Sequence, residues 1–205
     1  MPWWGVVSSV LAPILLIGGW TAAADLQPVP FDPISSTISS LAAQGMPYRW
    51  LITLALLGVG ACHVTTGLAL RAAAGAGRIM LIFGGVSGIL IAANPEPSQG
   101  GSVPHVLFSV TGGLLMTLWP VAAIRQDDGA PFALRPAVAC AAGLFMVTLL
   151  LWFTAELFGG GQLGLAERAV TADQSLWPLI VVLSVLAAAR RPVAAAERVA
   201  AVRSR

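Results

Sequence analysis

The sequence contains no lysine, two cysteines, two histidines and one tyrosine, and only 10% of its 205 residues are charged. Hydrophobic residues make up 57%. Soluble domains carry about 25% charged residues, so this scarcity of charge excludes an ordinary soluble protein. Cys62 and Cys140 lie in apolar segments, at membrane-embedded or cytoplasmic-side positions where thiols stay reduced, and we therefore predict no disulfide.

Six apolar segments predict helices that cross a membrane, for which about 20 residues are needed. They cover residues 3–24, 48–70, 78–93, 103–124, 136–157 and 175–189. No stretch alternates with a period of two residues, which disfavours a membrane β-barrel. We predict an all-α polytopic membrane protein, with a six-transmembrane-helix bundle over residues 1–191 and a cytoplasmic basic tail over residues 192–205.

The first apolar segment ends in Ala22-Ala23-Ala24, which is similar to the cleavage site of a signal peptide. No basic residue precedes the apolar run, however, and Trp3 and Trp4 are typical of an interfacial anchor. We expect this segment to be retained as the first membrane helix.

Arginine alone sets the predicted orientation, because lysine is absent. Nine of the eleven arginines fall on the side of the two termini, and only Arg49 and Arg168 fall on the other side. The positive-inside rule therefore predicts that both termini are cytoplasmic. The alanine- and arginine-rich, lysine-free composition suggests a high-GC bacterial genome, so we expect a multi-pass protein of the bacterial plasma membrane.

The longest polar interruption is FDPISSTISSLAAQG, residues 31–45, in the first outer loop. Asp32, which precedes a proline, has the pattern of a helix N-cap with proline at the first helical position. Ile34, Ile38 and Leu41 recur at helical spacing and leave the serines on the opposite face. We predict a short amphipathic helix that lies at the membrane surface.

The two histidines lie at different predicted depths. His63 falls within the second helix, where it is either a functional residue or a neutral side chain that hydrogen-bonds a neighbouring helix. Ser102 and Pro104 predict the start of the fourth helix, which puts His105 in its first turn at the outer surface. Since histidines at opposite depths cannot share an ion, we predict no metal site, and we expect no cofactor.

The third outer loop holds two local patterns. Residues 159–164, GGGQLG, match G-x-G-x-x-G, but a membrane helix precedes them in place of the strand that a dinucleotide site requires. Thr171 and Gln174 have the spacing of a capping box, which predicts that the sixth helix begins there.

Three stretches together resemble a known family. They are DPISSTISSLAAQG after the first membrane helix, the histidine that opens the fourth helix, and GLAERAVTADQSLW before the sixth. With these landmarks the sequence resembles domain-of-unknown-function family 998, a prokaryotic group of six-helix integral membrane proteins. The resemblance extends over nearly the whole chain up to Arg191. It implies a fold and a location, and supplies no activity.

A compact bundle would bring the polar residues of the three outer loops together, so we expect a shared outer pocket. We interpret it as a site that binds or moves a lipid or small amphiphile, and we expect membrane lipids but no nucleic acid as partners. The candidate ligand-binding residues are His105, Arg168, Glu167, Asp32 and Ser36. Arg168 is included because a guanidinium binds anions with two parallel hydrogen bonds.

Two alternatives stay open. One is a structural or partner-binding membrane subunit whose loops satisfy one another. The other is an interfacial hydrolase or transferase, with Ser39 or Ser36 as nucleophile, His105 as base, and Asp32 or Glu167 orienting it. The G-x-S-x-G nucleophile elbow is absent, so we lean toward a protein that is not an enzyme and keep Ser39 and His105 as the catalytic candidates.

Overall fold

The structure, a computed structural model, describes the backbone of residues 1–203 and the side chains of residues 1–190. This part of the chain is all-helical, with six helices long and apolar enough to cross a membrane and a short helix between the first two. The elements are α1 Trp3–Asp25, α2 Ile38–Ala42, α3 Arg49–Ala69, α4 Gly75–Ala93, α5 Val103–Ala122, the 3-10 helix η1 Phe132–Leu134, α6 Pro136–Glu156 and α7 Leu163–Arg203. The predicted fold class is confirmed.

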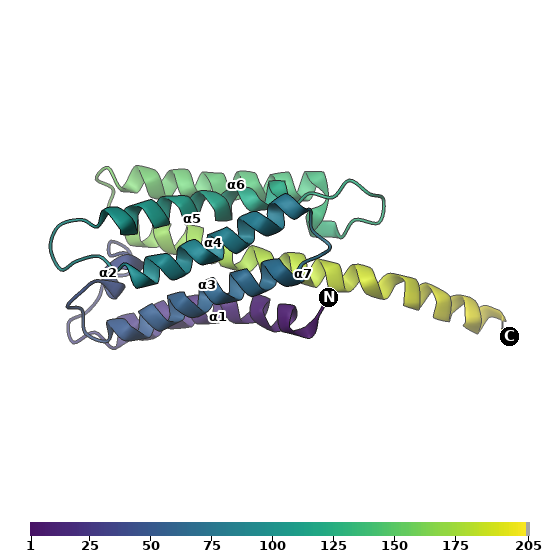
Figure 1. The fold of residues 1–205 in the computed structure, drawn as a ribbon, viewed down its shortest axis with the longest axis horizontal. Helices are drawn as coiled ribbons and strands as arrows, with labels where there is room; N and C mark the ends of the chain where they lie inside the picture. The colour runs from purple at the N-terminus through teal and green to yellow at the C-terminus, as the bar shows by residue number, and fades with distance from the viewer. Residues whose placement is uncertain (204–205) are drawn as a thin grey trace.

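The six long helices run side by side along one axis (Figure 1). The helix α2 and the α4–α5 and α6–α7 loops share one end, which we call the α2 end, and the N-terminus and the other two inter-helix loops share the opposite end. Beyond the bundle, α7 continues past the N-terminal end (Figure 1). The side chains of the predicted basic tail, residues 192–205, lie outside the described residues.

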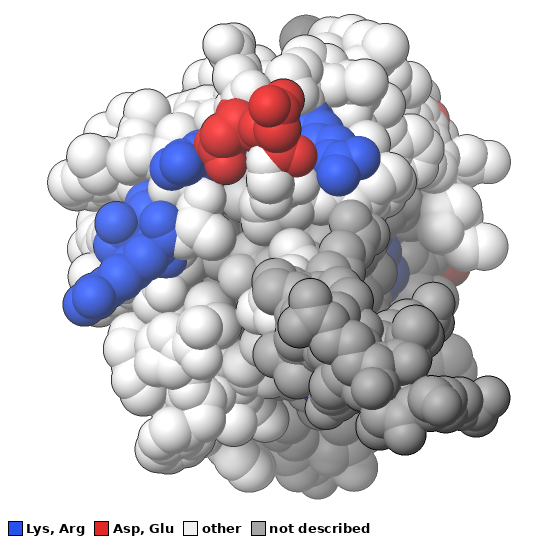
Figure 2. Space-filling model, turned by 90° about the vertical axis from the view of Figure 1, so that its right-hand side faces the viewer, with Lys and Arg blue, Asp and Glu red and all other residues white. Residues whose placement is uncertain are grey.

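Charged side chains gather at the end that carries the N-terminus, as Figure 2 shows. Arg71 follows α3, Arg78 lies in the first turn of α4, and Arg125 lies between α5 and η1. The Nε of Arg125 donates a hydrogen bond of 2.8 Å to Asp127, which holds the pKa of that carboxyl below its usual value. The distribution agrees with the predicted charge asymmetry, and the orientation in the membrane stays a prediction.

Glycine brings α3 and α4 into direct backbone contact. A Cβ atom on Gly60 would lie 2.6 Å from the carbonyl oxygen of Gly85, and a Cβ on Gly85 would lie 2.6 Å from the carbonyl oxygen of Gly60. Small residues serve the same purpose in many membrane helix pairs, because lipid-facing apolar helices gain from close packing.

The start predicted for the fourth membrane helix, α5, is confirmed. The hydroxyl of Ser102 accepts the backbone N–H of His105 at 3.3 Å, and Pro104 lies in the first turn. His105 is therefore in the first turn of α5, at the α2 end of the bundle.

The start predicted for the short helix is wrong. Asp32 accepts the N–H of Ile34 at 3.0 Å and the hydroxyl of Ser35 at 2.6 Å, which folds residues 33–36 into a turn. These bonds, the Ser35 hydroxyl first, hold the pKa of Asp32 below its usual value. The cap of α2 is Thr37, whose hydroxyl accepts the N–H of Ser40 at 3.0 Å. Ile34 is consequently 50% exposed and leaves the predicted apolar stripe.

The start predicted for the sixth membrane helix is also wrong, since α7 begins at Leu163. Thr171 does not cap: its hydroxyl donates to the carbonyl of Glu167 at 2.7 Å, inside the helix. Gln174 donates to the carbonyl of Gly113 and to the hydroxyl of Thr117 on α5. Because the polar side chains of these turns find partners within the protein, the helix can extend over residues that sequence polarity assigned to a loop.

We expect Gly60→Ala to lower the free energy of unfolding by about 1–3 kcal/mol, the usual cost of overpacking, because its methyl group meets a backbone oxygen that cannot rotate away. Gly18→Ala on α1 is the matched control, since no atom lies within 4 Å of the added methyl. Thermal unfolding of both variants in detergent tests this, and equal unfolding temperatures would contradict it.

Candidate functional site

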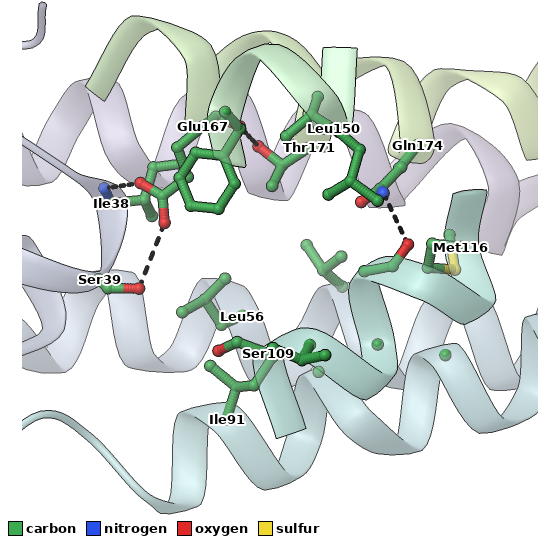
Figure 3. Close-up of a pocket in the computed structure, with 18 of the residues that line it drawn as sticks. Ile38, Ser39, Leu56, Ile91, Ser109, Met116, Leu150, Glu167, Thr171 and Gln174 are labelled. Atoms are coloured by element: carbon green, nitrogen blue, oxygen red, sulfur yellow. Dashed lines mark hydrogen bonds between the residues drawn. The ribbon is translucent and has the colours of Figure 1, made fainter. Parts of the chain in front are cut away.

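A cavity of about 550 Å³ lies within the bundle, walled mainly by α3, α4, α5, α6 and α7 (Figure 3). Most of its wall is apolar, and Leu56, Ile91, Met116 and Leu150 point into it from four helices. Six of the lining positions are glycines. These are Gly60, Gly84, Gly85, Gly88, Gly112 and Gly113. Its size falls within the range of small-molecule sites.

Polar side chains are concentrated where the cavity reaches the α2 end. They come from α2 and its cap, the α4–α5 loop and the first turns of α5 and α7. The group consists of Thr37, Ser39, Glu96, His105, Glu167 and Thr171. The cavity is therefore amphipathic, with one polar end and a long apolar wall.

Ser39 and His105 meet at this polar end although 66 residues separate them. The Nε2 atom of His105 lies 3.2 Å from the Ser39 hydroxyl, and its Nδ1 lies 3.0 Å from the backbone carbonyl oxygen of Asn94. A carbonyl oxygen can only accept, so Nδ1 carries the proton of that bond. In a neutral imidazole, Nε2 is then the acceptor that faces Ser39.

Glu167 connects the first turns of α7 to α2. Its Oε2 accepts the backbone N–H of Ile38, and its Oε1 lies 3.3 Å from the Ser39 hydroxyl, which donates to it (Figure 3). The carboxylate therefore fixes the backbone just before Ser39 and competes with His105 for the same hydroxyl proton.

The charge at the polar end is acidic. Glu96 and Glu167 line it, and no arginine is among the lining residues described. The Oε1 of Glu96 lies 3.7 Å from Nε2 of His105, and its side chain is 39% exposed, which marks the edge of the cavity toward solvent. Such an end attracts hydrogen-bond donors and cations and repels anions.

Arg168 is held away from the cavity, in a second cluster that we call the loop clamp. Its Nη1 donates to the carbonyl oxygens of Pro33, Ser36 and Gly164 at 2.9, 2.8 and 2.9 Å. The guanidinium lies 5.9 Å from the ring centre of Trp20 and 5.8 Å from that of Phe31, within cation–π range.

Gly164 completes the loop clamp, one helical turn before Arg168. A Cβ on Gly164 would overlap the backbone of Ser36 and lie 2.8 Å from the carbonyl oxygen of Pro33. The last glycine of the G-x-G-x-x-G match therefore lets residues 33–36 rest directly on α7. The loop between α1 and α2 is bound to α7 by its backbone.

The predicted site residues divide between these two clusters. Ser39, His105 and Glu167 come together at the cavity. Ser36 contributes its carbonyl to the loop clamp, and Asp32 is engaged in the turn before α2. The predicted ligand contact of Arg168 stays untested, with Nη1 shared among three carbonyls.

Two features were not predicted. The first is the Asn94 carbonyl that orients His105, which has no signal in a sequence because every residue has a carbonyl. The second is the depth of the cavity, since the sequence predicted a pocket shared by the loops and not a space that extends between the helices. His63 lines its wall, is 4% exposed, and has no hydrogen-bond partner for either ring nitrogen among the described residues.

We expect Arg168→Ala to lower the free energy of unfolding by about 3 kcal/mol, because it leaves three carbonyls without their charged donor. Arg71→Ala, at an exposed position, is the control and should change stability by no more than about 0.5 kcal/mol. Thermal unfolding in detergent measures both. A destabilisation of similar size in the two variants would contradict the structural role of the loop clamp.

Comparisons with known proteins give a family and no further relative. No curated protein and no solved structure matches this chain. The family model described as "Protein of unknown function (DUF998)" matches residues 10–184, which include all six candidate membrane helices wholly or in part, together with α2. The chain therefore belongs to the DUF998 family, as its landmark stretches predicted.

Proposed function

We propose that this membrane protein binds an amphiphile, with the apolar part in the cavity and the polar group at Ser39, His105 and Glu167. The observation that carries the proposal is the distribution of side chains around one continuous space, which is mostly apolar along its length and has its carboxyl groups at one end. A ligand of matching polarity removes its chain from water and places its hydrogen-bonding groups among partners.

The route of entry supports a ligand drawn from the surrounding membrane. The most exposed apolar side chains of the cavity wall belong to two adjacent helices, α5 and α6. They are Val106, Val110, Leu114 and Leu157. We therefore expect a chain to enter sideways from the lipid hydrocarbon, on the side of the bundle formed by α5 and α6.

The acidic polar end indicates the head group. Glu96 and Glu167 favour a neutral hydroxyl-bearing or an ammonium head and disfavour a carboxylate or phosphate. We therefore infer an uncharged or cationic amphiphile such as a long-chain glycerol derivative. This differs from an anion held by Arg168, the contact expected from the sequence.

The test is binding of a radiolabelled long-chain monoalkylglycerol, a non-cleavable ether, to the purified full-length protein in detergent. We expect saturable binding that is at least about tenfold tighter, or about 1.4 kcal/mol, than binding of the fatty acid anion of the same chain length. Binding that does not saturate would overturn the proposal. Equal affinity for the ether and the fatty acid anion would overturn the head-group assignment.

Filling the cavity should abolish this binding. In Gly113→Leu the added Cβ lies 3.9 Å from the nearest atom, on Leu150, so the helix accepts the residue while its side chain enters the cavity. We expect at least a tenfold loss of affinity. Gly18→Leu, which places the same side chain in open space on α1, should bind like the wild type. Unchanged binding by Gly113→Leu would place the ligand elsewhere, and a protein that binds no amphiphile would favour the structural-subunit alternative.

A further inference from the structure

We propose that Ser39 and His105 are a nucleophile and its general base, and that they cleave a carboxylic ester whose acyl chain occupies the cavity. The inference rests on the proposed function, since it needs the chain in that cavity. It deepens that function by naming a substrate class, neutral acyl esters, and a reaction, acyl transfer to water.

The hydrogen bonds around His105 give its ring the arrangement that this chemistry needs. In serine hydrolases, one imidazole nitrogen donates to an acceptor that fixes the ring, and the other accepts the serine proton. Here the Asn94 carbonyl is the fixing acceptor at 3.0 Å, and Nε2 faces the Ser39 hydroxyl at 3.2 Å. His105 is 4% exposed, so neighbouring residues hold the ring in place.

Ser39 is positioned by groups outside its own side chain. Glu167 holds the N–H of Ile38, the residue before it, and the Thr37 hydroxyl holds the N–H of Ser40, the residue after it. The Ser39 proton has two acceptors at nearly equal distance, Nε2 of His105 and Oε1 of Glu167. Rotation about the Cβ–Oγ bond redirects the hydroxyl from the Glu167 carboxylate to the His105 nitrogen. Glu167 therefore acts as a positioning residue.

The cavity determines where an ester would lie. Ser39 and His105 both line the polar end. An acyl chain that lies along the apolar wall therefore places the carbonyl carbon of its ester beside the Ser39 oxygen. Thr37 and Ser109 add hydroxyls to the same wall, and Ser109 follows His105 by one turn on α5. These hydroxyls are the candidate donors to the carbonyl oxygen as it gains negative charge. The half-exposed Glu96 marks the side from which water reaches the ester.

The reaction proceeds in two balanced halves. The Ser39 oxygen bonds to the carbonyl carbon while its proton moves to Nε2 of His105. The carbon–oxygen bond to the alcohol then breaks, and the alcohol leaves with that proton. Water attacks the acyl-Ser39 ester and gives a proton to Nε2; the carboxylic acid departs and the proton returns to Ser39. No electron is exchanged, and the acidic polar end favours release of the anionic product.

A long-chain alkyl fluorophosphonate, which reacts with activated serines, tests the inference on the purified full-length protein. Intact-mass and peptide mass spectrometry should show one adduct, on Ser39. Ser39→Ala should form none, and His105→Gln should react at least about 100-fold more slowly, the lower range for loss of a general base. Ser98→Ala is the control, because Ser98 is an exposed serine of the α4–α5 loop that does not line the cavity, and it should react like the wild type.

Binding of the ether used above separates this inference from the proposed function. If the wild type binds the ether but forms no adduct and releases no fatty acid from a monoacylglycerol, the esterase assignment is overturned and binding stands. An adduct that persists in Ser39→Ala also overturns it. If the ether is not bound at all, both fail. Labelling of Ser39 that depends on His105, in a wild type that binds the ether, supports both.

Discussion

The arrangement of the α2 end depends on the contact between residues 33–38 and the first two turns of α7. Glu167 and Arg168 are neighbours in sequence, and each holds backbone groups of residues 33–38. Charges that leave water need compensating partners, and here backbone N–H and carbonyl groups supply them for both signs. Gly164 permits the close approach. Without this contact α2 would keep its apolar packing on α1 and α3 but would lose the hydrogen bonds that join its first residues to α7.

The same contact explains why two adjacent charged residues, Glu167 and Arg168, have different roles. Successive residues on a helix point about 100° apart, so Arg168 faces the loop clamp while Glu167 faces the cavity. Local helix geometry thus separates a structural cation from an acidic polar end. The preference proposed for a neutral or cationic amphiphile follows from that separation, because the arginine that would attract an anion is turned away.

Much of the fold could be predicted because membrane insertion depends on local composition. Apolar runs located six helices, and the Ser102 cap located the start of α5 and with it His105. Topology put Ser39, His105 and Glu167 on one side of the membrane. Their contact was beyond prediction, since hydrogen bonds across 66 and 128 residues depend on how the helices pack.

The sequence by itself determined the class of protein, the helices, the family and the side on which the polar residues gather, because hydropathy and helix capping act over a few residues. Tertiary structure alone decided where α2 and α7 begin, which way Arg168 faces, and that a cavity lies between the helices. Each of these depends on a partner distant in the chain: Gln174 of α7 hydrogen-bonds α5, and Glu167 accepts the N–H of Ile38 at the start of α2. A local pattern reports which hydrogen bonds a residue can make, and packing selects which of them it does make.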